Sequence, residues 1–152
     1  MGRETIPNRD ERRKIRKQVE GALEKYRLYL LSIPEDKLPR VTASYSLVPG
    51  GQSDPSSSSW AERAAIEKVD YERERMEYIQ TIQDAVNRLN SKERQIIIKR
   101  YMVDDEAVYD YEIFNDMGIS ESFYYKIKRQ AYDKLAVLFG LYDVDELMRH
   151  KA

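Results

Sequence analysis

The clearest chemical pattern in this sequence lies between Asp110 and Ala131. A short helical segment is followed there by Gly118, by Ser120 as a helix cap, and by a longer helical segment, an order typical of a helix-turn-helix. Gly118 stands at the sharp turn, where the backbone needs a positive φ that glycine adopts at little steric cost. The pattern indicates non-covalent chemistry, namely hydrogen bonding to DNA bases and phosphates.

The apolar spacing of the longer segment predicts which of its side chains face outward. Apolar residues that recur at intervals of three and four are expected to face inward, at Tyr124, Ile127, Ala131, Leu135 and Leu138. An apolar corner between the two helices is expected at Ile113, Met117 and Ile119. The opposite face carries the residues predicted to read bases in the major groove, which are Glu121, Ser122, Tyr125, Lys126 and Arg129.

Basic residues around this pattern are predicted to contact DNA phosphates. The 152-residue chain has a formal net charge of only −1, but residues 91–101 hold four basic residues against one acidic residue, and residues 104–116 hold six acidic residues and no basic one. The predicted phosphate contacts, which include the capping serine, are Lys92, Arg94, Lys99, Ser120, Lys128 and Lys134. Lys128 is expected to point towards the flank of its helix.

Residues that could do covalent or metal chemistry are scarce. The sequence has no cysteine, which excludes disulfides, thiol catalysis and cysteine-based metal sites. Its single histidine, His150, excludes histidine-based triads and two-histidine metal sites. The carboxylates at 104–106 lack the spacing of a calcium loop and are expected to be solvated. We therefore expect a protein that is not an enzyme and that needs neither a cofactor nor a metal.

A basic helix is predicted near the start of the chain, over residues 10–33. Its apolar residues follow a narrow stripe, Ile15, Val19, Ala22, Tyr26, Tyr29 and Ile33. Another helix must cover such a stripe, and two arrangements stay open: a hairpin with the helix predicted at 60–89, or a two-chain coiled coil that forms a homodimer. The basic run at 12–17 could contact phosphates or a polymerase, or be merely solvated.

The remaining patterns predict an all-α fold. Proline, glycine and serine are concentrated at 34–59, which predicts a linker with extended propensity at 40–48. Further helices are expected at 60–89, at 91–102, at 109–117 and from 121 to about 139. Capping boxes are predicted for the first two of these, from Ser59 with Glu62 and from Asn90 with Glu93. Gly140 is expected to end the last one. The expected organisation is a basic N-terminal helix (1–33), the linker (34–59), a long connecting helix (60–89), a helix-turn-helix domain (90–142) and a C-terminal tail (143–152).

Two family resemblances add to this interpretation. The segment 89–101, the helix pair and the segment 131–135 are similar to the fourth region of bacterial sigma factors. Over residues 4–142 the chain resembles the ArpU family of phage-encoded transcriptional regulators, through Tyr26-Arg27, the motif at 41–46, Arg100-Tyr101, the motif at 118–125 and the segment 131–141. The resemblance implies regulation of late phage genes for packaging and lysis. Aromatic bulk at 123–125 departs from the commoner sigma-like pattern, and which of the three residues faces DNA stays open.

The expected partner is double-stranded DNA, with host RNA polymerase and a second copy of the chain as further candidates. No apolar run approaches the roughly 20 residues of a membrane span, so we expect a protein of the bacterial cytoplasm without membrane contact. Two other functions stay open: a small-terminase-like DNA packaging subunit, and a sigma-like adaptor that binds RNA polymerase without touching DNA.

Overall fold

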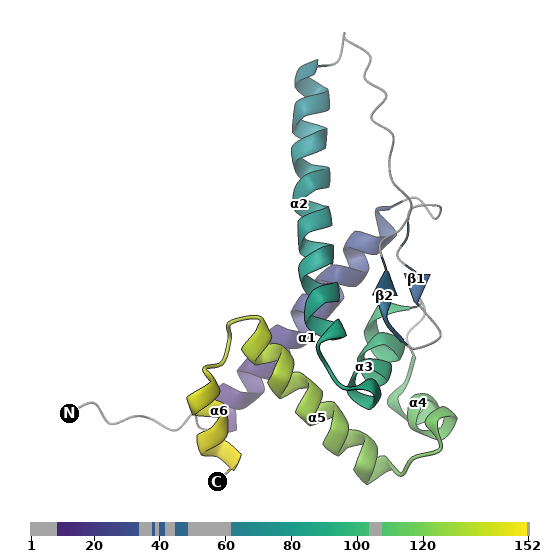
Figure 1. The fold of residues 1–152 in the computed structure, drawn as a ribbon, viewed down its shortest axis with the longest axis vertical. Coiled ribbons are helices and arrows are strands. Elements are labelled where there is room, and N and C mark those ends of the chain that lie inside the picture. Colours follow the sequence, from purple (N-terminus) through teal and green to yellow (C-terminus); the bar gives the residue numbers. More distant parts are fainter. Residues whose placement is uncertain are drawn as a thin grey trace, which may run out of the picture.

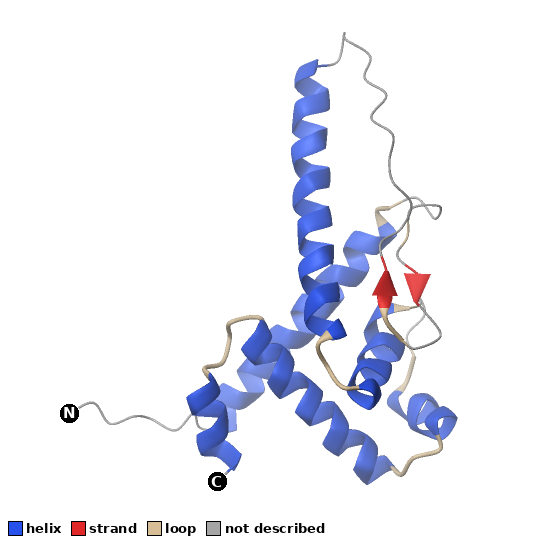
Figure 2. Cartoon of the chain, viewed as in Figure 1, coloured by secondary structure: helices blue, strands red, loops and turns tan. Residues whose placement is uncertain are grey.

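The computed structural model describes residues 9–33, 38, 40–41, 45–48, 62–103 and 108–151. Its elements in chain order are α1 (Arg9–Leu31), β1 (Arg40–Val41), β2 (Leu47–Val48), α2 (Glu62–Asn87), α3 (Ser91–Ile97), the π-helical turn η3 (Ile98–Met102), α4 (Asp110–Met117), α5 (Glu121–Leu138) and α6 (Val144–Lys151). The fold is all-α, as predicted, and within the described residues the one departure is the antiparallel pairing of β1 with β2 (Figure 2).

The first helix is part of the main core and is not a separate arm. Val19, Leu23 and Tyr26 of α1 are fully buried, in one apolar cluster with Ala131 and Leu135 of α5. Figure 1 shows α1 crossing the body of the molecule, and its contacts are with α2, η3 and α5. The predicted stripe is therefore covered within the chain, by α5 and η3 as well as by α2, and a homodimer stays a prediction.

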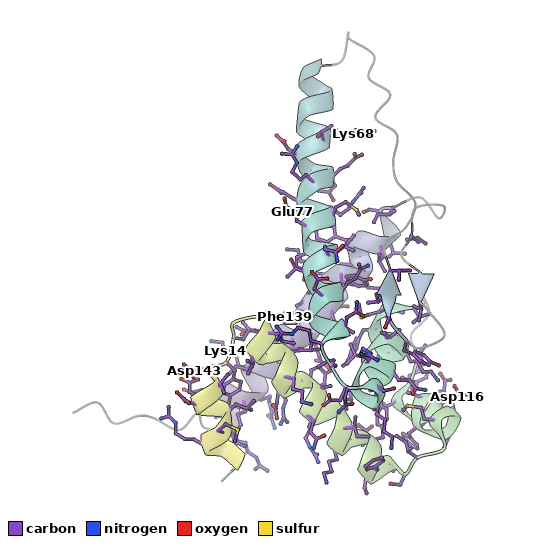
Figure 3. The ribbon with its side chains drawn as sticks, viewed as in Figure 1. Lys14, Lys68, Glu77, Asp116, Phe139 and Asp143 are labelled. Atoms are coloured by element: carbon purple, nitrogen blue, oxygen red, sulfur yellow. The ribbon has the colours of Figure 1, made fainter. Side chains whose placement is uncertain are left out.

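The long helix α2 is buried along only part of its length. The sequence predicts an apolar stripe on this helix that includes Val69, Met76, Ile79, Ile82 and Val86, and the last three lie in the core. Val69 and Met76 were expected on the same stripe but are 48% and 47% exposed, because α2 extends beyond the body that covers its second half (Figures 1 and 3). The alternating charges at 67–77 predict a solvated or coiled-coil segment in the first half of this helix, and its exposure agrees with the solvated alternative.

The local signals at helix ends are confirmed where the structure describes them. Asn90 and Glu93 form the predicted capping box of α3, and the Ser120 side chain accepts a hydrogen bond from the Phe123 backbone N–H at the start of α5. Gly118 has φ 67° and Gly140 has φ 73°, so both end a helix in the left-handed conformation that glycine favours. The predictions for Ser59 and for the carboxylates at 104–106 lie outside the described residues.

The helix predicted over 91–102 is continuous, but its second half is π-helical. Ile96, Ile97 and Ile98 are all completely buried, although three consecutive residues span about 200° of an α-helix. Ile96 packs in a small cluster under α4 and α5, while Ile97 and Ile98 pack in the main core. The segment therefore lies between two apolar clusters and joins them.

Candidate nucleic-acid interface

The two helices of the predicted helix-turn-helix meet at an apolar corner. Ile113 of α4 and Tyr124 and Ile127 of α5 are buried together with Ile96, and Met117 and Ile119 pack against them. The chain reverses between the helices at Gly118, whose N–H is bonded to the Asn115 carbonyl at 3.1 Å. The predicted corner is confirmed, and it fixes which face of α5 is turned away from the protein.

The side chains predicted to read bases all lie on the exposed face of α5. Exposure is found at each of the five positions, Glu121, Ser122, Tyr125, Lys126 and Arg129. Tyr124 is completely buried, as predicted, whereas Phe123 and Tyr125 on either side of it are 39% and 36% exposed. Of the three aromatic residues, the structure therefore leaves Phe123 and Tyr125 accessible to a ligand. Base reading itself stays a prediction.

Lys128 is the clearest correction to the predicted phosphate contacts. Its side chain is only 11% exposed, and its Nζ lies 2.9 Å from Asp110 Oδ1. The same Oδ1 atom accepts a hydrogen bond of 2.6 Å from the Tyr124 hydroxyl and lies 3.5 Å from Arg100 Nε. Lys128 was expected to point towards the flank of α5, but it points towards the start of α4, where it neutralises a half-buried carboxylate.

This cluster around Asp110 joins α4 to α5 and shifts the pKa values of Asp110 and Tyr124. Burial alone would raise the pKa of Asp110, but hydrogen bonds from Tyr124 and Lys128 and the nearby cations outweigh it, so that the pKa is lowered. Burial, followed by the hydrogen bond to the Asp110 carboxylate, raises the pKa of the Tyr124 hydroxyl. Asp110 is therefore ionised and Tyr124 neutral at neutral pH, and each holds the other in place.

Three other predicted phosphate residues also have partners within the chain. Lys134 Nζ lies 2.8 Å from Glu93 Oε1, and Lys99 Nζ lies 2.9 Å from Asp116 Oδ2. Arg94 donates hydrogen bonds to the carbonyl of Asn87, the last residue of α2, and to that of Leu89 in the turn that follows. These cations stabilise helix ends and helix pairs in the structure, so they are weaker candidates for phosphate contacts than the sequence implied.

Lys92 is the exception among the basic residues of α3. It is exposed, and its Nζ lies 4.9 Å from the centre of the Phe123 ring, beside the start of α5. Lys92, Phe123, Lys126 and Gln130 are among the residues that line a surface hollow of about 370 Å³. The structure therefore places a cationic side chain, Lys92, and an aromatic one, Phe123, beside the exposed face of α5. Phe123 was not among the residues predicted to read bases.

A tyrosine pair in the core was missed by the sequence interpretation. The hydroxyls of Tyr101 in η3 and Tyr132 in α5 are hydrogen-bonded to each other, and Glu20 Oε1 of α1 lies 3.3 Å from the first and 3.2 Å from the second. Each hydroxyl has one proton, so one tyrosine donates to Glu20 while the other donates to its tyrosine partner. Burial raises the pKa of Tyr101 to about 12. Tyrosines on apolar stripes commonly carry such a polar partner when buried, but the sequence did not identify Glu20 as that partner.

The pair of Lys134 and Glu93 gives a test of the corrected role of Lys134. Glu93 is completely buried, so Lys134→Ala leaves a buried carboxylate without its cation. Because the Lys134 side chain is 48% exposed, we expect a loss of roughly 2 kcal/mol in the free energy of unfolding, less than the roughly 3–5 kcal/mol of a fully buried pair. Urea denaturation measures this, with Lys126→Ala on the exposed face of α5 as the matched control. Equal stability of the two variants would contradict the structural role of Lys134.

Comparison with known proteins finds a match to a family model and to a phage-related protein. The family model described as "Protein of unknown function (DUF1492)" matches residues 43–136. An uncharacterised phage-related protein of Listeria innocua serovar 6a is 30% identical over 121 residues, which cover 80% of this chain and 83% of that relative. No solved structure matches. None of the helices that the structure describes has the length and apolar character needed to cross a membrane.

Proposed function

This chain belongs to the DUF1492 family, and from that premise we propose that it is a phage or prophage protein that binds duplex DNA through α4 and α5. In this proposal it is a transcriptional regulator of late genes, as its resemblance to the ArpU family implies. Its role is binding and not catalysis, because the sequence offers no cysteine and a single histidine.

The observation that carries the proposal is the contrast between the two faces of α5. Tyr124, Ile127 and Lys128 are buried against α3 and α4, so the orientation of α5 is set by the protein itself. The opposite face presents a row of exposed polar side chains that includes Lys126 and Arg129. A rigidly held helix with a polar outer face after a short helix and a glycine turn is the arrangement that places a recognition helix in the major groove.

Arg129 is the side chain whose loss best tests this function. Arginine can donate two hydrogen bonds to a guanine edge, so Arg129→Ala should weaken binding to the preferred site by about 1–3 kcal/mol and relax preference at one base position. Selection from a random duplex library, followed by fluorescence anisotropy on the selected site, measures both effects. Arg73→Ala, which removes an exposed arginine from the projecting part of α2, is the control and should bind as the unaltered protein does.

Two outcomes would contradict the proposal. One is the absence of a selected sequence at low salt, because a base-reading helix must discriminate between duplexes. The other is an identical base preference for Arg129→Ala and Arg73→Ala. The regulatory part has its own test, which is genome-wide binding in the native host compared with transcription start sites. Pull-down of RNA polymerase with and without DNA separates a DNA-bound regulator from an adaptor.

A further inference from the structure

In the first two turns of α1, arginines occupy positions at which the packing of the rest of the helix would lead one to expect apolar residues. Arg12 stands one heptad before the buried Val19, and Arg16 and Arg9 stand one and two heptads before the buried Leu23. Because seven residues are close to two helical turns, these arginines continue the face of α1 that is buried further along the helix. With Arg13 they line a surface hollow of about 370 Å³.

This arginine face (Arg9, Arg12, Arg13 and Arg16) lies beside the C-terminal end of α5. The charges of Arg12 and Arg16 act on the hydroxyl of Tyr142, which follows α5 in the turn to α6, and the carboxylates of Asp133 and Glu146 act on the same hydroxyl. Figure 3 shows Lys14 of α1 and Asp143 of the same turn in this part of the molecule. The arginine face is therefore attached to the same rigid body as the exposed face of α5, although the two are far apart in the sequence.

The positive charge of this face is not balanced by ion pairs. None of its four arginines is paired with a carboxylate in the part of the chain that the structure describes. Asp10 stands three residues before Arg13, at the edge of this face, and Glu11 lies on the opposite side of the helix. Like charges three and four residues apart destabilise an isolated helix, and these arginines gain no ion pair in return among the described residues, which favours an anionic partner.

We propose that the arginine face of α1 binds the phosphate backbone of duplex DNA outside the segment read by α5. The inference rests on the proposed function and names a second contact of the same complex. Arginine is suited to this role because its planar guanidinium binds phosphate oxygens through two parallel hydrogen bonds and stays charged at all relevant pH values.

The dimensions of the molecule agree with a contact to flanking DNA. The 18 residues of α5 span about 27 Å, with the predicted base-reading side chains in the first half and the arginine face near the other end. One turn of B-DNA spans roughly 34–36 Å. A phosphate bound by α1 therefore belongs to the flanking turn of the duplex, so its contribution should depend on duplex length and not on sequence.

The test compares two duplexes that share the selected site, one containing only that site and one extended by about one helical turn on each side. For the unaltered protein, the extension should raise affinity about tenfold and steepen the dependence on salt. The variant Arg9→Gln/Arg13→Gln should lose this gain, with a salt slope shallower by about 2 on the long duplex and unchanged affinity on the short one. Both substituted positions are exposed, and the melting temperature of the variant checks that it is folded.

Two control proteins make the result specific. Lys68→Gln/Arg73→Gln removes the same charge from the projecting part of α2 and should keep the full gain from the extension. Arg9→Lys/Arg13→Lys keeps the charge and should retain most of it.

Three outcomes would overturn the inference. If the glutamine variant of α1 matches the α2 control on both duplexes while Arg129→Ala still weakens binding, the inference fails and the proposed function stands. If the glutamine variant weakens binding equally on both duplexes, the flanking position is wrong. If the unaltered protein binds neither duplex, the inference and the proposed function fail together.

Discussion

Val19→Asp is expected to unfold the whole described body, including the helix-turn-helix, although α4 begins only at Asp110. Val19 is completely buried in the same apolar cluster as Ala131 and Leu135 of α5. A buried carboxylate without a partner costs about 5 kcal/mol or more, which is comparable with the roughly 5–15 kcal/mol that stabilises a small domain. Circular dichroism should show loss of helix well beyond α1, together with loss of DNA binding.

The control for this variant is Gln18→Asp, which adds the same charge at the neighbouring exposed position of α1. Its melting temperature should stay close to that of the unaltered protein, because an exposed charge on a helix changes stability by a few tenths of a kcal/mol. If the two variants have the same melting temperature, α1 is not part of the cooperative core and is instead an independent helical arm.

Asp110→Ala is expected to be the most damaging single change within the helix-turn-helix itself. It leaves the ammonium group of Lys128, which is 11% exposed, and the hydroxyl of the buried Tyr124 without their shared acceptor. Breaking a buried ion pair from one side costs about 3 kcal/mol, much of it from the charge that stays behind. Chemical denaturation at neutral pH measures the loss. The matched control is Asp116→Ala, whose 72% exposed carboxylate pairs with Lys99 and should contribute less than about 1 kcal/mol.

The pH dependence of this variant follows from the lowered pKa of Asp110. A carboxylate whose pKa is lower in the folded state than the roughly 3.9 of an unfolded aspartate stabilises the protein fully above that value. The stabilisation is lost as the pH falls through the folded-state pKa. The difference in stability between the unaltered protein and Asp110→Ala should therefore be largest at neutral pH and shrink below about pH 4. A difference that grows on acidification would contradict the assignment.

Local chemistry in the sequence determined the helices, their ends and the two faces of α5. The capping residues Asn90 and Ser120, and the glycines at 118 and 140, act within one turn of their own position, so their effects could be predicted without any knowledge of the fold. The inward position of Tyr124 followed from helical spacing alone, because residues three and four apart share a face.

Tertiary structure decided which helices cover each other and which charges are paired. The sequence predicted that the stripe on α1 needed a cover but could not identify α5 as one of the helices that provide it, since apolar contacts are not specific for a partner in sequence. The spacing of basic residues predicted Lys128 and Lys134 as free cations, whereas the fold brings each to a carboxylate 18 and 41 residues away. A charge pattern along the chain shows where cations are, but only the packing of distant segments determines which of them are neutralised within the protein and which are left to bind a partner.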